Sequence, residues 1–193
     1  MEAPDLYISA DVEADGPIPG QYSMLAFGLC VAGRFNGSRF ERADPTRRTF
    51  YRELAPISED FVPDALEIAG LDRDRLRVDG AQPAEAMAEA RDWVIAESRD
   101  HRPVLVGFPV VYDWMFLYWY FERFTSEGSP FGHASALDIK TMYQQKASVV
   151  VSSAGKDDLP PSLRSTRPHE HHALADALEQ AEIFANVFEW KGG

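Results

Sequence analysis

Three short acidic stretches, far apart in the chain, constrain the fold more than any other feature of the sequence. They are Asp11-Val12-Glu13, Tyr112-Asp113-Trp114, and His171-His172-Ala173-Leu174-Ala175-Asp176. Each stretch stands beside an apolar strand or helix pattern, so its carboxylates border a hydrophobic core. A buried carboxylate is costly unless a cation or a hydrogen-bond donor lies beside it. We therefore expect the three stretches to meet at one site.

Length and charge narrow the class of protein. A chain of 193 residues is most simply one domain, covering residues 1–193, with enough length to bury a core. Its 45% hydrophobic and 26% charged residues are typical of a soluble globular protein. The net charge of −12 argues against an extended basic surface for long polyanions. It leaves room for short nucleic acids, because bound cations can supply the positive charge of a site.

The cysteine content and the N-terminus indicate an intracellular protein. Cys30 is the single cysteine, so the chain cannot form an internal disulfide, and its neighbours Leu29 and Val31 predict that it is buried. The first five residues, Met-Glu-Ala-Pro-Asp, lack the basic start and apolar block of a signal peptide. We expect a cytoplasmic location.

The apolar run from Val104 to Phe121 has the composition of a short membrane span, with Asp113 as its single charged residue. An aspartate in the middle of a span costs about 2.5–3.5 kcal/mol on insertion scales. Gly107 and Pro109 also interrupt the run. The pattern therefore predicts a buried strand, a turn and an aromatic-rich helix, and no contact with a membrane.

The hydrophobic periodicity predicts an α/β fold. Three strands come first, at Leu6–Asp11, Met24–Ala32 and Thr49–Leu54. Helices and strands then alternate: helices at Pro63–Ala69 and from Pro83, a strand at Val104–Val106, a helix at Tyr112–Phe124, a strand at Ala136–Ile139 and a helix at Ala173–Trp190. This order predicts a central mixed sheet of five strands flanked by helices. The segment 147–168 reads as an irregular loop near the site.

The carboxylates of the first two stretches have positions that suit metal binding. Asp11 and Glu13 are two residues apart on a predicted strand, so they point to the same face, at the end where ligands bind in open α/β sheets. Two solvated acids remain an alternative interpretation. Asp113 lies among apolar residues, where it is either a ligand or the cap of the following helix.

The third stretch combines histidines with a carboxylate. His171 and Asp176 are five residues apart, so we expect His171 to precede the helix and Asp176 to lie inside it. A mobile histidine and a fixed carboxylate then approach one point from different directions. His169, His171 and His172 also form a cluster, and a zinc site remains an alternative. However, no second histidine or cysteine group has the usual zinc-site spacing.

Together these residues resemble the three motifs of the DEDDh 3′–5′ exonucleases. The matching segments are Asp11-Val12-Glu13-Ala14-Asp15-Gly16, Tyr112-Asp113 with Leu117, and His171-x-Ala173-x-x-Asp176-Ala177. The resemblance extends from Leu6 to Phe188 and includes the strand Ala136–Ile139 between the second and third motifs. It implies the ribonuclease H-like fold of ribonuclease T, oligoribonuclease and the polymerase proofreading subunit.

The sequence departs from that family at two places. Many members carry a His-Asn pair where this chain has Phe108-Pro109, and a threonine where it has Ala14. These changes leave the acidic ligands intact. They put the contacts to substrate and the choice between RNA and DNA in question.

The resemblance implies a metal-dependent 3′–5′ exonuclease that acts on the 3′ end of short or single-stranded nucleic acid. RNA is slightly favoured over DNA, and nucleoside 5′-monophosphates are the expected products. Two divalent cations, Mg²⁺ or Mn²⁺, would be held by Asp11, Glu13, Asp113 and Asp176. His171, which the family spacing selects over His172, would accept the proton of the attacking water. The resemblance also implies a homodimer.

Two other functions fit the same residues. One is a phosphodiesterase for small nucleotides on the same fold, and the other is a catalytically silent module that binds nucleic acid. The complete set of acidic ligands favours an enzyme. The aromatic residues of the helix 112–124 fit core packing or a dimer contact better than base stacking. Lys156, Arg164 and Arg167 either contact a substrate phosphate or are solvated loop charges, and we favour the second.

Overall fold

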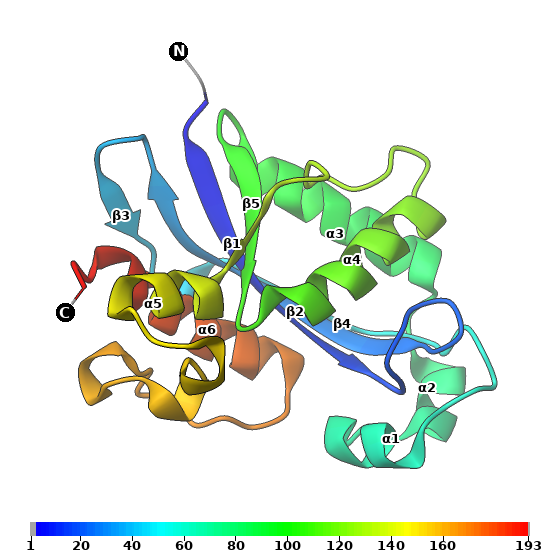
Figure 1. The fold of residues 1–193 in the computed structure, drawn as a ribbon. Helices are drawn as coiled ribbons and strands as arrows, with labels where there is room; N and C mark the ends of the chain where they lie inside the picture. Colours follow the sequence, from blue (N-terminus) through cyan, green and yellow to red (C-terminus); the bar gives the residue numbers. More distant parts are fainter. Residues whose placement is uncertain (1–2, 193) are drawn as a thin grey trace.

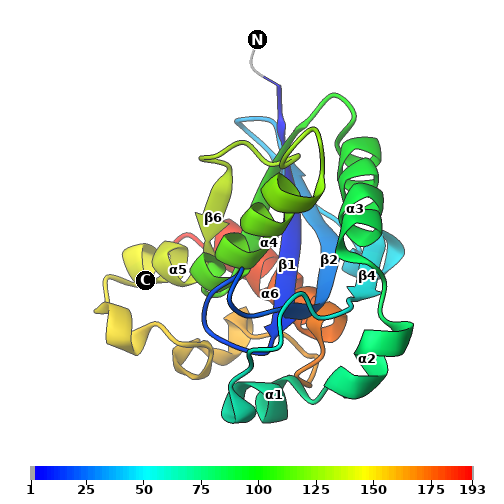
Figure 2. The ribbon, with the colours of Figure 1, turned by 90° about the vertical axis from the view of Figure 1, so that its right-hand side faces the viewer.

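The computed structural model describes residues 3–192 and contains one mixed sheet with helices on both faces (Figures 1 and 2). The strands are β1 (Asp5–Ala14), β2 (Met24–Phe35), β3 (Phe40–Arg42), β4 (Thr49–Glu53), β5 (Arg102–Gly107) and β6 (Ala136–Asp138). Their order is β3-β2-β1-β5-β6, and β4 pairs with β2. Strands β1 and β2 are antiparallel, whereas β5 runs parallel to β1 and β6 runs parallel to β5. The predicted α/β architecture is confirmed.

The helices cover the sheet in two layers. They are α1 (Pro63–Ala69), α2 (Arg73–Asp79), α3 (Pro83–Ser98), α4 (Val110–Phe124), α5 (Ile139–Ala147) and α6 (Ala173–Glu189). Helices α3 and α4 pack on one face of the sheet, and α5 and α6 pack on the other. Helices α1 and α2 lie beyond the carboxyl end of β1 (Figure 1).

The predicted number of strands was wrong, because the sheet has six strands among the described residues. The additional strand, β3, forms a short hairpin with the end of β2, pairing Phe35 with Phe40. Residues 36–39 form the turn, in which the backbone of Gly37 has a φ of 92°. Three residues are too few to produce a clear alternation in the sequence, so the hairpin reads as a polar connection.

Helices α2 and α5 were not predicted either. Each one begins at an aspartate that caps it: the side chain of Asp72 accepts a hydrogen bond from the backbone of Arg75, and that of Asp138 accepts one from Thr141. Both helices are short, with seven and nine residues, and carry few apolar positions. The aspartates are therefore the signal that could have located them.

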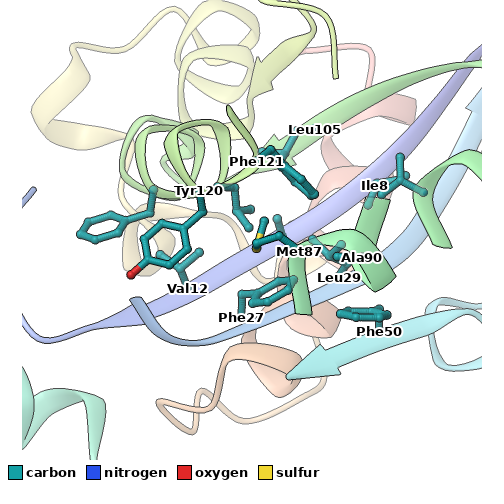
Figure 3. Close-up of a cluster of buried hydrophobic side chains, with 14 of the residues drawn as sticks. Ile8, Val12, Phe27, Leu29, Phe50, Met87, Ala90, Leu105, Tyr120 and Phe121 are labelled. Atoms are coloured by element: carbon teal, nitrogen blue, oxygen red, sulfur yellow. The ribbon is translucent and has the colours of Figure 1, made fainter. Parts of the chain in front are cut away.

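Alternation along β1 separates two hydrophobic cores. Leu6, Ile8 and Val12 face α3 and α4, in the core of Figure 3 that includes Phe27 and Phe121. Tyr7 faces the opposite way, toward α5 and α6. Asp11 and Glu13 have the parity of Tyr7, so they belong to the α6 face of the sheet.

The apolar run that resembled a membrane span forms β5 and the buried side of α4. No helix among residues 3–192 is long and apolar enough to cross a bilayer. Cys30 is buried, as predicted. Residues 1, 2 and 193 lie outside the described residues. Residues 1 and 2 begin the N-terminal segment from which we expected a cytoplasmic location.

Gly28 of β2 permits the close approach of α6 to the sheet. A Cβ atom at this position would lie 2.5 Å from the backbone N and Cα of Leu174, in the first turn of α6. The backbone of a helix cannot move away from such a contact without moving the residues that follow. The position of Asp176 therefore depends on the lack of a side chain at residue 28.

We predict that Gly28→Ala destabilises the protein by about 1–3 kcal/mol, because the added methyl group overpacks the contact between β2 and α6. Gly155→Ala is the control, since its Cβ would meet only the side-chain oxygen of Asp158, at 3.1 Å. Urea unfolding measures both variants. Equal stability of the two would contradict the proposed contact.

Candidate active site

Three carboxylates from two elements converge at the carboxyl end of β1. The oxygens of Asp11, Glu13 and Asp176 offer ligand atoms that all lie within 4.8 Å of one another. Glu13 and Asp176 are buried, and Asp176 is only 2% exposed. The first and third acidic stretches of the sequence therefore meet, as expected, where β1 ends and α6 begins.

Asp113 stands next to this group and ties α4 to β1. It is buried in the first turn of α4, and its Oδ1 accepts a hydrogen bond from the backbone N–H of Val12 at 3.1 Å. Gly107 leaves room for the other oxygen, because a Cβ there would lie 3.0 Å from Oδ2 of Asp113. Asp113 thus lies beside the carboxylates of the two other stretches but outside their compact group.

Burial and mutual repulsion raise the pKa values of these acids. Desolvation raises the pKa of Asp11 well above its ordinary value, and the negative charge of Asp113 raises it further. Burial, with a smaller contribution from the charge of Asp176, raises the pKa of Glu13 to about 7. The pKa of Asp113 rises to about 8, mainly through burial. Such a group is more stable with a cation bound, because the cation compensates the charges.

The three histidines occupy different places. His171 lies just before α6, with a φ of 49°, and faces the same cleft as Asp11. His172 caps α6, where its Nδ1 accepts a 3.4 Å hydrogen bond from Ala175, and its ring stacks on Tyr51 at 4.7 Å. His169 contacts Asp176, with 3.0 Å between Nδ1 and Oδ1.

A cleft of about 380 Å³ opens over the carboxylates. Its lining includes the acids Asp11, Glu13 and Asp176 and, from α1, the apolar residues Ala65 and Ile68. Ile68 is 61% exposed although it is apolar. The cleft therefore combines an acidic floor with an apolar rim, an arrangement typical of a site for a small polar and partly aromatic ligand.

Known proteins share the sequence and the fold. No protein-family model matches the chain. The 3′–5′ DNA exonuclease Cap18 of Escherichia coli is 39% identical over 181 residues, which are 93% of this chain and 90% of that protein. The chain belongs to the DEDDh family of 3′–5′ exonucleases. It is accordingly an enzyme that hydrolyses nucleic acid from the 3′ end.

Solved structures confirm the ribonuclease H-like fold. The zinc-bound form of E. coli ExoI in complex with single-stranded DNA covers 98% of this chain, with a TM-score of 0.60 and 17% identity. This chain spans 41% of the length of ExoI. S. pombe Pop2p, in its Mg²⁺- and Mn²⁺-bound form, covers 97% of this chain and 85% of its own, with a TM-score of 0.60 and 18% identity.

Gln180 is a site residue of this exonuclease that sequence reasoning missed. It is 1% exposed and lies one helical turn after Asp176 on α6. Its Nε2 donates a 2.6 Å hydrogen bond to Oδ1 of Asp11, and its Oε1 accepts one from the backbone of Phe108 at 2.5 Å. Gln180 therefore links Asp11 to Phe108, the first of the two residues that replace the His-Asn pair of other family members. The four-residue spacing from Asp176 is the signal that could have found it.

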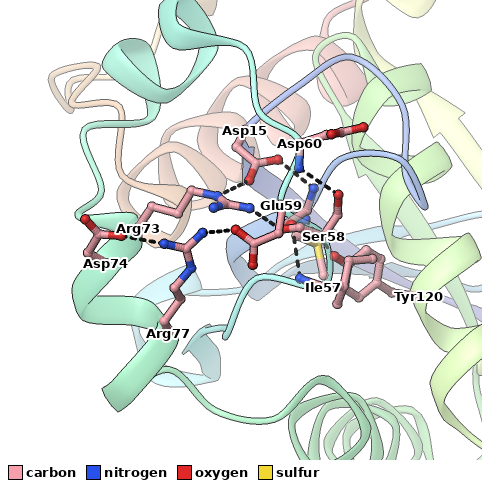
Figure 4. Close-up of polar contacts among 11 residues, drawn as sticks. Asp15, Ile57, Ser58, Glu59, Asp60, Arg73, Asp74, Arg77 and Tyr120 are labelled. Carbon is pink, nitrogen blue, oxygen red and sulfur yellow. Dashed lines mark hydrogen bonds and ion pairs between the residues drawn. The ribbon is translucent and has the colours of Figure 1, made fainter.

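A buried ion pair holds the rim of the cleft. Asp15 follows β1 directly and is fully buried, and its Oδ2 lies 2.9 Å from Nε of Arg73 in α2 (Figure 4). Its Oδ1 accepts a 2.6 Å hydrogen bond from the backbone of Ser23. Arg73 also donates to the backbone carbonyl of Ser58. These contacts fasten the segment between β4 and α2, which contains α1, to the end of the catalytic strand.

The segment 147–168 contains the short 3₁₀ helices η2 (Val151–Ser153), η3 (Lys156–Asp158) and η4 (Pro161–Leu163), and it lies against α6. Two of its basic residues form ion pairs with α6: Lys156 with Glu179 at 2.8 Å, and Arg167 with Glu182 at 2.7 Å. Arg164 donates to backbone carbonyls of the same segment. These three charges hold the loop, so they are not free loop charges.

We predict that Gln180→Glu shifts the acid limb of the pH profile of kcat/KM to higher pH. The new carboxylate keeps an acceptor for Phe108 but replaces the donor to Asp11 with a like charge, which raises the pKa of Asp11 further. The shift is measured from steady-state rates taken between pH 5 and 9, at intervals of about half a pH unit. Gln180→Leu is the control, because it costs stability, about 1–3 kcal/mol, without adding a charge. An unmoved acid limb in Gln180→Glu would contradict the electrostatic role.

We also predict that Arg73→Met destabilises the protein by about 3–5 kcal/mol, since it leaves the Asp15 carboxylate buried without its cation. Adding Asp15→Asn should recover part of this loss. Arg77→Met is the matched control: Arg77 pairs with Asp74 and Glu59 on the surface, so its loss should cost about 1 kcal/mol or less. Thermal unfolding of the wild type and the three variants measures these losses, and similar losses for Arg73→Met and Arg77→Met would refute the prediction.

Proposed function

We propose that this exonuclease removes nucleotides from single-stranded nucleic acid with the help of two divalent cations, Mg²⁺ or Mn²⁺, and releases nucleoside 5′-monophosphates. The observation that carries the proposal is the convergence of Asp11, Glu13 and Asp176 within 4.8 Å, with Asp113 beside them. An all-oxygen donor set with several negative charges suits these hard cations.

The residues fit the cations on the evidence of their own charges. Burial and the neighbouring negative charges raise the pKa values of Asp11, Glu13 and Asp113, and donors such as Gln180 and the backbone of Val12 relieve only part of that repulsion. Asp11, Glu13 and Asp176 would hold one cation, and Asp11 with Asp113 would hold the second. Bound there, the cations would polarise the phosphodiester and stabilise the negative charge that develops on it.

His171 is the residue that we propose as general base. Its imidazole lines the cleft near the acids, while His172 is occupied by its cap and by Tyr51. The ring nitrogen would take a proton from the water that attacks the terminal phosphorus. The bond from phosphorus to the 3′ oxygen then breaks, so the shortened chain keeps a 3′-hydroxyl and the released nucleotide keeps the phosphate at its 5′ position.

The apolar rim supports a single-stranded 3′ end as substrate. Ala65 and Ile68 of α1 and Tyr112 line the same cleft as the acids. An unpaired terminal base can stack against such a surface while its phosphate lies over the acids. The hydroxyl of Tyr112 donates to the backbone carbonyl of Gly16, which fixes the ring.

The choice of sugar is part of the proposal. The 39% identical relative is named for DNA, which supports DNA as a substrate, whereas the sequence led us to expect a slight preference for RNA.

A homodimer and a cytoplasmic location stay predictions. The buried side of α4 serves the core, with Phe116 and Tyr120 fully buried, and the stacked pair Trp114 and Tyr118 lies outside it.

We predict that His171→Ala lowers the rate of 3′ shortening by about 10²–10⁴-fold, in keeping with the loss of a general base. Cation affinity, measured by calorimetry with Mn²⁺, should be retained, because the acids are intact. The assay uses 5′-labelled single-stranded DNA and RNA oligonucleotides in Mg²⁺, Mn²⁺ or EDTA. His172→Ala is the matched control and should keep most of the rate.

The outcomes separate the alternatives. Loss of activity in His172→Ala with full activity in His171→Ala would move the base to the neighbouring residue. Asp11→Ala should abolish shortening of both polymers. If wild-type protein degrades only dinucleotides, the phosphodiesterase function replaces the exonuclease proposed here.

A further inference from the structure

A second group of metal-ligand atoms lies at the mouth of the cleft. Nitrogens of His169 and His171 and an oxygen of Asp176 all lie within 4.8 Å of one another. This group differs in chemistry from the carboxylates below it, because two of its three donors are imidazoles. The third donor, Asp176, comes from the first turn of α6.

The separations suit one small cation. Nδ1 of His169 lies 3.0 Å from Oδ1 of Asp176, and the rings of His169 and His171 have centroids 4.6 Å apart, inclined at 69°. Zinc binds nitrogen and oxygen at about 2.0–2.2 Å in a tetrahedral arrangement, so two of its ligand atoms lie about 3.3–3.5 Å apart. A movement of a few tenths of an ångström in His169 would bring its Nδ1 and Oδ1 of Asp176 to that separation.

Access and support are both present. His169 and His171 are exposed, so an ion can enter from solvent, whereas Asp176 is buried and accepts a 3.1 Å hydrogen bond from the backbone of Glu170. Glu179 lies 3.1 Å from the same Nδ1 of His169 and is itself paired with Lys156. The imidazole of His169 is thus held between two carboxylates, which fix the position of its ring.

We propose that His169, His171 and Asp176 form a zinc site distinct from the all-carboxylate group of Asp11, Glu13 and Asp176. Imidazole and carboxylate donors suit Zn²⁺, whereas Mg²⁺ and Mn²⁺ prefer oxygen ligands. Three protein ligands leave a fourth position open to water. Because the two groups share Asp176, zinc at the histidine-containing site competes with a cation held by Asp11, Glu13 and Asp176.

A consequence follows that rests on the function proposed above. Zinc bound to His171 occupies the imidazole nitrogen that would accept the proton from water. Zinc would therefore inhibit nucleotide release even when Mg²⁺ or Mn²⁺ is in excess. The binding of zinc itself does not depend on the enzyme having that mechanism, so the two claims can be tested apart.

Titration of EDTA-treated, dialysed protein with zinc chloride in a calorimeter tests the site directly. We expect one tight event in wild type, weakened by more than about tenfold in His169→Gln, because glutamine keeps a hydrogen-bond donor for Asp176 without an imidazole. His172→Gln is the matched control and should bind as wild type does. Asp11→Asn removes a donor of the all-carboxylate group only, so this variant should still show the tight binding event.

Zinc K-edge X-ray absorption of the loaded protein counts the imidazole ligands. Two imidazole ligands in the wild type and one in His169→Gln support the site. Two imidazole ligands in both proteins would overturn it. The proposal also fails if Asp11→Asn loses the tight event while His169→Gln keeps it, since zinc would then sit among the carboxylates. Circular dichroism verifies that each variant is folded.

The inhibition has its own readout. The ratio of 3′-shortening rates with and without micromolar zinc, at saturating Mn²⁺, should fall in wild type and in His172→Gln but stay near one in His169→Gln. If zinc binds as predicted and this ratio is unchanged in wild type, the zinc site stands and the role of His171 as base falls.

Discussion

The alternation of side chains along β1 is the constraint on which the rest of the structure depends. One face of the strand carries Leu6, Ile8 and Val12 into the core under α3 and α4. The other face changes from apolar to acidic at its carboxyl end, where Asp11 and Glu13 meet α6. A shift of one residue in register would exchange the two sets, burying charges in the core and exposing apolar residues. The pairing of β1 with both β2 and β5 prevents that shift.

Like charges at the end of β1 make every neighbouring donor important. Gln180 and the backbone of Val12 each satisfy one carboxylate oxygen, and Arg73 neutralises Asp15. These contacts come from α6, β1 and α2, so three elements of the fold together offset the negative charge at the end of β1. Part of the net charge of −12 lies at this point, where the cations proposed above would offset it, so the acidic total is compatible with an anionic substrate.

The sequence was sufficient for the main elements because their patterns are long. Ten residues of β1, twelve of β2 and seventeen of α6 have clear periodicity, and α1 has the predicted bounds. The acidic stretches also led us to expect that Asp11, Glu13 and Asp176 lie together at one site. In contrast, β3 and α2 are too short for a periodic signal, and neither was predicted. Gln180 and Arg73 were missed because their roles depend on partners 169 and 58 residues away.

The attachment of α1 has a consequence for how this enzyme can diverge. The apolar rim formed by Ala65 and Ile68 belongs to a segment that is anchored to the end of β1 through the Asp15–Arg73 pair, which is separate from the acids of the cleft. Residues on the cleft side of α1 can therefore be exchanged while the anchor and the acids stay in place. On the function proposed above, the surface that meets the terminal base and the acids that carry the chemistry come from separate parts of the chain, so one can change without the other.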